Sequence, residues 1–313
     1  MLSLRKRLPS LSTTTVPGLA RSSTKWGNTA VLPSARCRTD TGARMGPTQG
    51  SAACWAPVSV RQRADGSTAV FPHFVLDRAK PGTVVVDTLG KRFLNESTSY
   101  HLFGKRMLER DAAGKCHVPA YLIADHRALA RYGLGMVRPG ARGLAAFVKD
   151  GYLVRAATLD DLAAQLGMEA AVLRRTVDTM NRYAASGIDE QFQRGTTRYQ
   201  KNLGDPAVQP NPTLGPIREA PYYAIRLYPG DIAASTGLQT DAQARVLGSG
   251  GTPIGGLYAI GNEMQSVMGG AYPGPGINLG PAITFAYAAV QAALSPSAVE
   301  PTAIPQQQRV LTA

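Results

Sequence analysis

The stretch that most constrains the fold covers residues 256–294 and reads GLYAIGNEMQSVMGGAYPGPGINLGPAITFAYAAVQAAL. Its first five residues, Gly256–Ile260, form an apolar run that is short enough for a buried strand. A loop dense in glycine follows over Gly261–Gly280. Proline fits the first turn of a helix, where its missing N–H is not needed, and an apolar run extends from Pro281 to Leu294. We therefore expect a strand, a glycine loop and a helix in succession.

This succession is a recurring way to hold an anionic or electron-rich ligand. Backbone N–H groups at a loop and at a helix N-terminus favour negative charge. Glycine lets the backbone approach the ligand closely and adopt a positive φ. A plain glycine-rich connection between two core elements would show the same glycines, because glycine spacing alone is weak evidence for a ligand. The residues around the glycines must decide between the two.

Composition excludes several classes of protein. The 313 residues suffice for two domains, and 44% of them are hydrophobic. No apolar run approaches the ~20 residues of a membrane helix, so we expect no membrane span and a cytoplasmic location. The three cysteines form no C-x-x-C pair, and the four histidines form no H-x-x-x-H pair. We therefore predict no metal site and no disulfide framework.

The net charge of +13 is unevenly distributed. Residues 1–50 contain eight Lys or Arg against the single acid Asp40, which places +7 of the charge there. The remaining residues carry 26 basic against 20 acidic side chains, which is a mild excess. This pattern predicts no folded basic face for nucleic acid. A nucleic-acid or anionic-surface binder acting through the basic N-terminal residues remains a minor alternative.

Both ends of the sequence lack the periodicity of folded elements. Residues 1–42 are rich in Ser, Thr and Arg and poor in acids, and we interpret them as an unmatched, disordered or aberrant N-terminus. A transit peptide is the alternative interpretation of the same composition. Residues 298–313 are rich in polar residues and proline, which is typical of a disordered tail.

Between these ends, the pattern predicts strands and helices in alternation. Residues 61–70 are expected to form a hairpin with its turn at Ala64–Gly66. A helix is expected from the cap Thr158 to Leu166, where Gly167 ends it, and a longer one over 168–185. The remaining runs with strand character are Thr83–Asp87, Lys91–Glu96, Pro119–Ala124, Pro221–Pro229 and Ala244–Leu247.

Several strings together resemble one flavoprotein family. In the glycine loop these are Gly261-Asn262-Glu263, Met268-Gly269-Gly270, Tyr272-Pro273-Gly274-Pro275-Gly276 and Leu279-Gly280-Pro281-Ala282, and earlier strings are RFLNES-x-x-Y and PYYAIRLYPGDIAASTGLQTDAQARVL. They are similar to the FAD-dependent 3-ketosteroid Δ1-dehydrogenase group of the fumarate reductase/succinate dehydrogenase flavoproteins. The resemblance covers residues from about 43 to 294.

The resemblance implies an α+β fold. It combines a capping substrate domain with the C-terminal part of an incomplete Rossmann-like FAD domain. Members of the family open with Gly-x-Gly-x-x-Gly, which cradles the FAD pyrophosphate, and no such string occurs in residues 1–50. The expected boundaries are 43–65 for a remnant of the FAD domain, 66–225 for the capping domain and 226–297 for the C-terminal segment of the FAD domain.

The resemblance also implies a site for FAD and for a ketone substrate. In the glycine loop it implies cofactor contacts from Gly261, Asn262, Glu263, Gly276, Ile277, Asn278 and Leu279. Tyr272 and the N–H of Gly276 would hydrogen-bond the substrate carbonyl, and Tyr100 would take the α-proton. A tyrosine with a pKa of about 10 needs help to ionise, and the tyrosine that assists in the family would lie in the unmatched half.

The reaction implied is desaturation of a 3-ketosteroid-like substrate beside its carbonyl. A base removes the α-proton, donors stabilise the enolate, and flavin N5 accepts a hydride from the β-carbon. An external acceptor would then reoxidise the flavin. The alternative is a truncated, non-catalytic remnant that cannot hold FAD, because the pyrophosphate string is missing.

Overall fold

The computed structural model describes residues 53–295 except 75–76, 110–111, 116, 270–273 and 275. The expectations for residues 1–42 and 298–313 therefore lie outside the described residues. The strands are β1 (Ala53–Gln62), β2 (Thr68–Pro72), β3 (Thr83–Val86), β4 (Ala120–Ala124), β5 (Leu153–Ala156), β6 (Tyr222–Ala234), β7 (Arg245–Leu247) and β8 (Pro253–Tyr258). The helices are α1 (Tyr100–Leu108), α2 (His126–Tyr132), α3 (Leu144–Lys149), α4 (Leu159–Leu166), α5 (Ala170–Ser186), α6 (Arg198–Leu203), the 3₁₀ turn η1 (Gly261–Glu263) and α7 (Leu279–Leu294).

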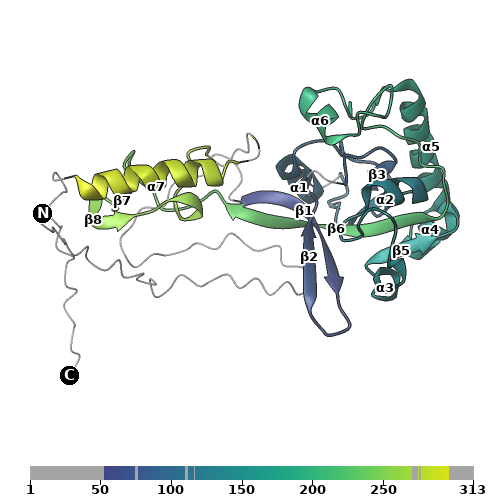
Figure 1. The fold of residues 1–313 in the computed structure, drawn as a ribbon, viewed down its shortest axis with the longest axis horizontal. Coiled ribbons are helices and arrows are strands. Elements are labelled where there is room, and N and C mark those ends of the chain that lie inside the picture. The colour runs from purple at the N-terminus through teal and green to yellow at the C-terminus, as the bar shows by residue number, and fades with distance from the viewer. Residues whose placement is uncertain are drawn as a thin grey trace, which may run out of the picture.

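The 13-residue strand β6 organises the molecule. Its first half, up to Leu227, pairs with β4 on one side and with β5 on the other. Its second half, from Tyr228, pairs antiparallel with β1, which in turn pairs with β2. Figure 1 shows β1 and β6 running out of the helix-covered part of the sheet toward β7, β8 and α7. The described elements thus form a sheet unit (β1–β6 with α1–α6) and a C-terminal segment (residues 235–295).

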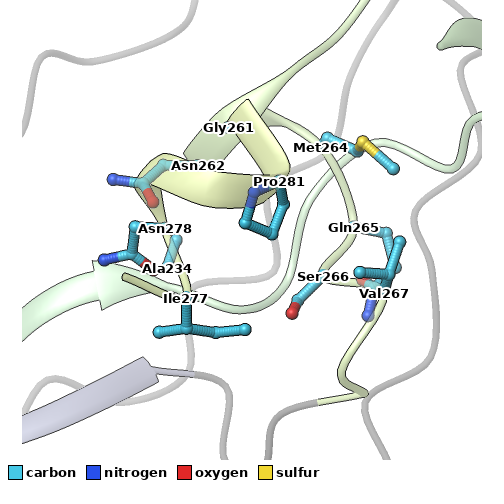
Figure 2. Close-up of a pocket in the computed structure, with 10 residues that line it drawn as sticks. All are labelled: Ala234, Gly261, Asn262, Met264, Gln265, Ser266, Val267, Ile277, Asn278 and Pro281. Atoms are coloured by element: carbon cyan, nitrogen blue, oxygen red, sulfur yellow. The ribbon is translucent and has the colours of Figure 1, made fainter. Parts of the chain in front are cut away.

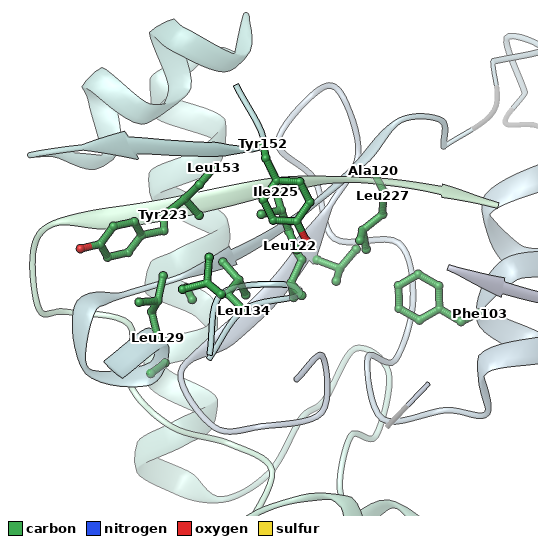
Figure 3. Close-up of a cluster of buried hydrophobic side chains, with 14 of the residues drawn as sticks. Phe103, Ala120, Leu122, Leu129, Leu134, Tyr152, Leu153, Tyr223, Ile225 and Leu227 are labelled. Carbon is green, nitrogen blue, oxygen red and sulfur yellow. The ribbon is translucent and has the colours of Figure 1, made fainter. Parts of the chain in front are cut away.

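The central strands are apolar because both faces of the sheet are covered. All four residues of β3 and all five residues of β4 are buried. One core cluster packs Phe103, Leu122, Leu129, Leu134 and Ile225, among others, as Figure 3 shows. A second cluster includes Val84, Val86 and Ile123 of the sheet with the inner faces of α4 and α5. A strand buried on both faces reads as a continuous apolar run, which is what these sequences show.

Helices α4 and α5 form as their sequences predict. The Thr158 side chain accepts a hydrogen bond from Asp161 N and caps α4, which ends at Gly167 with a φ of 72°. Helix α5 also ends at a glycine, Gly187, which has a φ of 76°. Glycine adopts this left-handed conformation without the steric cost that a Cβ atom imposes. The buried residues of α5 are Leu173, Val177, Met180 and Tyr183, spaced at three or four residues.

The C-terminal segment has a much smaller core. Its buried cluster comprises Val246, Ala259 and Met264, with Phe285 of α7 and three other apolar side chains packed against it. Helix α7 itself has no buried residue. Five of its large apolar side chains are more than half exposed, namely Leu279, Ile283, Tyr287, Val290 and Leu294.

Two sets of sequence predictions need correction. Lys91–Glu96 is not a strand in the structure; it is a turn-rich connection after β3, held by ion pairs of Arg92 and Glu96 rather than by strand pairing. Short elements that sequence patterning did not predict are α1, α2, α3, α6 and β5. Each has nine residues or fewer. Elements this short carry little sequence periodicity and depend on tertiary contacts for their stability.

Candidate active site

The glycine loop begins where β8 ends, and Gly261 makes this junction possible. Gly261 has a φ of 60°, and a Cβ atom there would lie 3.4 Å from the Cβ atom of Ala282 on α7. Gly237 approaches the same place even more closely, since a Cβ atom would lie 2.5 Å from the carbonyl carbon of Met264. Leu238 N donates to Glu263 O at 2.9 Å, which fixes the turn. The glycines thus bring three backbone segments together beside the start of α7.

A small, partly open pocket lies at this meeting point (Figure 2). It is lined by Ala234, Gly261, Asn262, Met264, Gln265, Ser266, Val267, Ile277, Asn278 and Pro281. These residues come from the end of β6, from η1 and the loop after it, and from the start of α7. Four of the residues predicted to contact a cofactor therefore line one pocket, namely Gly261, Asn262, Ile277 and Asn278.

The glycines described around the start of α7 present bare backbone. A Cβ atom at Gly274, Gly276 or Gly280 would meet no heavy atom of the described residues within 4 Å, and Gly276 has a φ of 92°. Leu279 is also exposed, at the first position of α7. A planar, electron-rich ring can lie against such backbone, with the N-terminus of α7 favouring negative charge on it. The residues present therefore fit an isoalloxazine ring.

The acidic residue of this loop, Glu263, is exposed, and no described residue forms an ion pair with its carboxylate. Its backbone, rather than its side chain, holds the turn. Tyr272, which we expected to hydrogen-bond the substrate carbonyl, lies outside the described residues. Its predicted role therefore stays a prediction.

The second part of the candidate site is the start of α1 in the sheet unit. Ser99 caps α1 by accepting a hydrogen bond from Leu102 N, and Tyr100 is the first helical residue. The ring of Tyr100 packs against the ring of Phe74, with centroids 4.9 Å apart. Burial raises the pKa of Tyr100 to about 12, and negative charge on Cys54 and on Tyr199 adds to this rise. Tyr100 is therefore a neutral phenol at neutral pH in this environment.

Helix α1 is fixed directly on β1. A Cβ atom at Gly104 would lie 2.6 Å from the Cβ atom of Trp55 and 3.2 Å from Ala56 N, so only glycine permits this approach. In addition, Trp55 N donates to His101 Nδ1 at 3.2 Å. The position of Tyr100 is thus set by the strand that runs toward the C-terminal segment.

Strand β1 connects the helix of Tyr100 with the pocket. Helix α1 packs on Trp55 of β1 through Gly104, and Sγ of the neighbouring Cys54 lies 3.9 Å from Ser235 Oγ just after β6. Ser235 O accepts a hydrogen bond from Ser266 N at 3.0 Å, and Ser266 lines the pocket. Pairing of β1 with β6 thus brings these distant residues together, and no local sequence signal marks Cys54, Ser235 or Ser266 as members of a site.

Comparison with known proteins identifies the family of this chain. The model of the FAD binding domain family matches residues 35–279. The 4-oxocyclohex-2-ene-1-carboxylate 5-dehydrogenase of Sinomonas cyclohexanicum is 41% identical over 250 residues, covering 79% of this chain and 42% of the relative. The 3-oxosteroid 1-dehydrogenase of Mycobacterium tuberculosis is 41% identical over 224 residues, covering 70% of this chain and 40% of the relative.

A solved structure gives the same relationship. The 3-ketosteroid Δ1-dehydrogenase of Sterolibacterium denitrificans, in complex with 1,4-androstadiene-3,17-dione, superposes with a TM-score of 0.73 at 40% identity. The match covers 82% of this chain and 45% of that structure, so the chain spans less than half the length of these relatives. Among the described residues, no helix is long and apolar enough to cross a bilayer. The chain belongs to the FAD binding domain family and is related to the 3-ketosteroid Δ1-dehydrogenases.

Proposed function

We propose that this chain supplies the substrate-facing part of an FAD-dependent dehydrogenase that desaturates a ring ketone beside its carbonyl. The observation that carries the proposal is the packing of α1, which begins at Tyr100, on β1, because Cys54 of β1 contacts Ser235 and Ser235 is hydrogen-bonded to Ser266 of the pocket. It supports a base at Tyr100 beside the backbone that would hold a flavin ring. A site formed between two structural units is a common location for a substrate.

The substrate class follows from the relatives. The enzymes named above act on an oxosteroid and on an oxocyclohexene carboxylate, and both substrates are ketones. We propose a 3-ketosteroid-like substrate within this class. An external electron acceptor and a cytoplasmic location complete the proposal.

Each residue would have a distinct task. The backbone from Gly276 to Leu279 and the side chains of Asn262 and Glu263 would hold the flavin, which accepts a hydride when bound. Tyr272 and Gly276 N–H would hydrogen-bond the substrate carbonyl and stabilise the enolate. Tyr100 would take the α-proton. The domain boundaries at 65, 225 and 297 and the Rossmann-like character of the C-terminal segment are part of the same proposal.

The test begins with purification of the chain and its absorbance spectrum. A stoichiometric flavin band, followed by dye-coupled oxidation of a 3-ketosteroid, is the expected result. Tyr272→Phe and Tyr100→Phe should then each lower kcat by about 100-fold or more while the flavin band persists. Unchanged kcat in both variants would overturn the assigned roles.

The alternative function is that of a non-catalytic chain that does not hold FAD. The absence of Gly-x-Gly-x-x-Gly from residues 1–50 motivates it. The spectrum separates the two, since a chain that stays colourless after incubation with excess FAD supports the alternative.

A further inference from the structure

A phenylalanine ring lies against the candidate base in the sheet unit. Phe74 follows β2 by two residues, and its ring centroid is 4.9 Å from that of Tyr100, with the two planes inclined at 53°. Both residues are partly buried. Tilted aromatic pairs at this separation attract each other, because the positive edge of one ring meets the negative face of the other. The direction of the Tyr100 ring is therefore tied to the position of Phe74.

The backbone of Phe74 is joined to α1 by one side chain, that of Arg78. The fully buried Arg78 guanidinium donates from Nη2 to Phe74 O at 2.6 Å and from Nε to His73 O at 2.8 Å. Its Nη1 atom donates to Glu96 O, and its central carbon lies over the ring of Phe103 on α1, 5.1 Å from the centroid. Arg78 thus connects the segment that carries Phe74 with the segment that leads into α1 and with α1 itself.

The residue before Phe74 is fixed on β1. His73 N donates to Pro57 O at 2.8 Å, and His73 Nε2 lies 2.8 Å from Ser59 Oγ. On the other side of the imidazole ring, His73 Nδ1 lies 2.7 Å from Asp77 Oδ2. Because α1 also packs on β1, Phe74 and the start of α1 are held against the same strand, and these contacts set the relative placement of the two rings.

The direction of the Tyr100 ring matters because a phenol takes up a proton only within hydrogen-bond distance. The hydroxyl of a tyrosine stands at the far end of a rigid ring, so that rotation about the bonds near the backbone displaces the oxygen atom most. A displacement of about 1 Å can lower the rate of a chemical step about 100-fold. A neighbour that restricts the rotation of the Tyr100 ring would therefore raise the rate without contacting the reacting atoms.

We propose that Phe74 is a positioning residue for Tyr100, whose ring it holds in the direction that brings the hydroxyl to the α-carbon of the substrate. The inference rests on the proposed function. Phe74 carries no group that can transfer a proton, so it acts only through Tyr100. Its ring, fixed by Arg78 and by His73, limits the directions open to the Tyr100 side chain. A role confined to the folding of the sheet unit would need apolar volume at this position but no aromatic ring.

NMR on the flavin-free chain tests the contact. With ¹³C-labelled phenylalanine and tyrosine, we expect nuclear Overhauser effects between the rings of Phe74 and Tyr100, assigned with Phe74→Leu and Tyr100→Phe. Phe74→Leu should also move the Tyr100 ring resonances toward their positions in the urea-unfolded chain, while circular dichroism shows native secondary structure. The matched control is Phe147→Leu, because the Phe147 ring lies 5.8 Å from that of Tyr152; it should move the Tyr152 resonances and not those of Tyr100. Absence of the Overhauser effects in the wild type, or unmoved Tyr100 resonances in a folded Phe74→Leu variant, would overturn the contact.

Turnover tests the positioning role. In the flavin-loaded protein, Phe74→Leu should lower kcat about 10-fold or more and leave KM within about twofold. Phe74→Tyr retains an aromatic ring and should keep kcat within about threefold of the wild type, whereas Phe147→Leu should change neither constant. Unchanged kcat in Phe74→Leu, or equal losses in Phe74→Leu and Phe74→Tyr, would overturn the role. A wild-type chain without flavin or turnover would instead contradict the proposed function, and the NMR measurements would still decide the contact.

Discussion

Gly104 shows how one absent methyl group sets the distance between a helix and a strand. Replacing glycine by alanine inside a helix ordinarily stabilises it by about 1 kcal/mol. In Gly104→Ala, however, the new Cβ atom would lie 2.6 Å from Trp55 Cβ and 3.2 Å from Ala56 N, and neither atom belongs to a flexible side-chain end. Overpacking of this kind costs about 1–3 kcal/mol, so we expect net destabilisation. Urea denaturation measures it, with Gly250→Ala as the control because a Cβ atom there meets nothing within 4 Å.

Glu96 belongs to a buried ion-pair network, and its ionisation makes the free energy of unfolding depend on pH. Burial would raise its pKa, but Arg92, with an Nη2–Oε2 distance of 2.6 Å, and Arg194 outweigh burial and lower the pKa overall. A carboxylate with a lowered folded-state pKa stabilises the protein above its unfolded pKa of about 4.3 and loses that contribution as the pH falls.

Glu96→Gln should therefore destabilise the sheet unit by about 3–5 kcal/mol near pH 7, because Arg194 loses its ion-pair partner and Arg92 keeps only Asp189. The variant should also lose less additional stability than the wild type when the pH falls below about 4. Urea denaturation across pH checks both effects. Glu109→Gln breaks a half-exposed ion pair with Arg106, and it should change the free energy of unfolding and its pH dependence little. Equal acid sensitivity of the Glu96→Gln variant and the wild type would contradict the assignment.

At the scale of elements, a buried hydrogen-bond chain connects β1, the end of β2 and the start of β5. Ser59 Oγ lies 2.8 Å from His73 Nε2 and 2.7 Å from Tyr152 OH, and Tyr152 OH accepts from Met136 N at 3.0 Å. Tyr152→Phe leaves the partly buried Met136 N–H without its acceptor and removes the Ser59 contact, so we expect a loss of about 1–3 kcal/mol. The free energy of unfolding in urea measures this loss. Tyr222→Phe is the matched control, since its hydroxyl only meets Arg218 O at 3.2 Å near the surface; a similar cost in both variants would refute the assignment.

Sequence patterning predicted elements where local chemistry suffices. The Thr158 cap, the glycines that end α4 and α5, and the four-residue stripe of α5 specify those helices locally. Helix α7 was likewise predicted to within two residues at its start. The short elements α1 and α6 were missed, because their stability comes from contacts such as that of Gly104 with Trp55.

Part of the candidate site could likewise be predicted from local sequence, and part of it could not. The glycine loop could be predicted, because glycine is needed where the backbone turns at Gly261 and lies open at Gly276. The residues around Tyr100 could not be predicted from spacing. Cys54 and Ser235 are separated by 181 residues and meet only through the β1–β6 pairing.

At the scale of the whole molecule, stability is concentrated in the sheet unit. Both large core clusters lie there, whereas the C-terminal segment buries three apolar residues in its cluster. Helices α5 and α7 make a matched pair, since they have 17 and 16 residues. Four side chains of α5 are buried and none of α7 is. Local opening costs least where few apolar contacts must break.

We therefore expect the amides of α7 in the isolated chain to exchange with deuterium about 100-fold faster than those of α5. Hydrogen-exchange mass spectrometry on peptides that cover the two helices measures the difference, and low concentrations of urea should abolish the remaining protection of α7 first. Ile283, which is 63% exposed, provides a control, because Ile283→Gln should leave both exchange rates nearly unchanged. Equal protection of the two helices would contradict the prediction and would show that the apolar face of α7 is covered in solution.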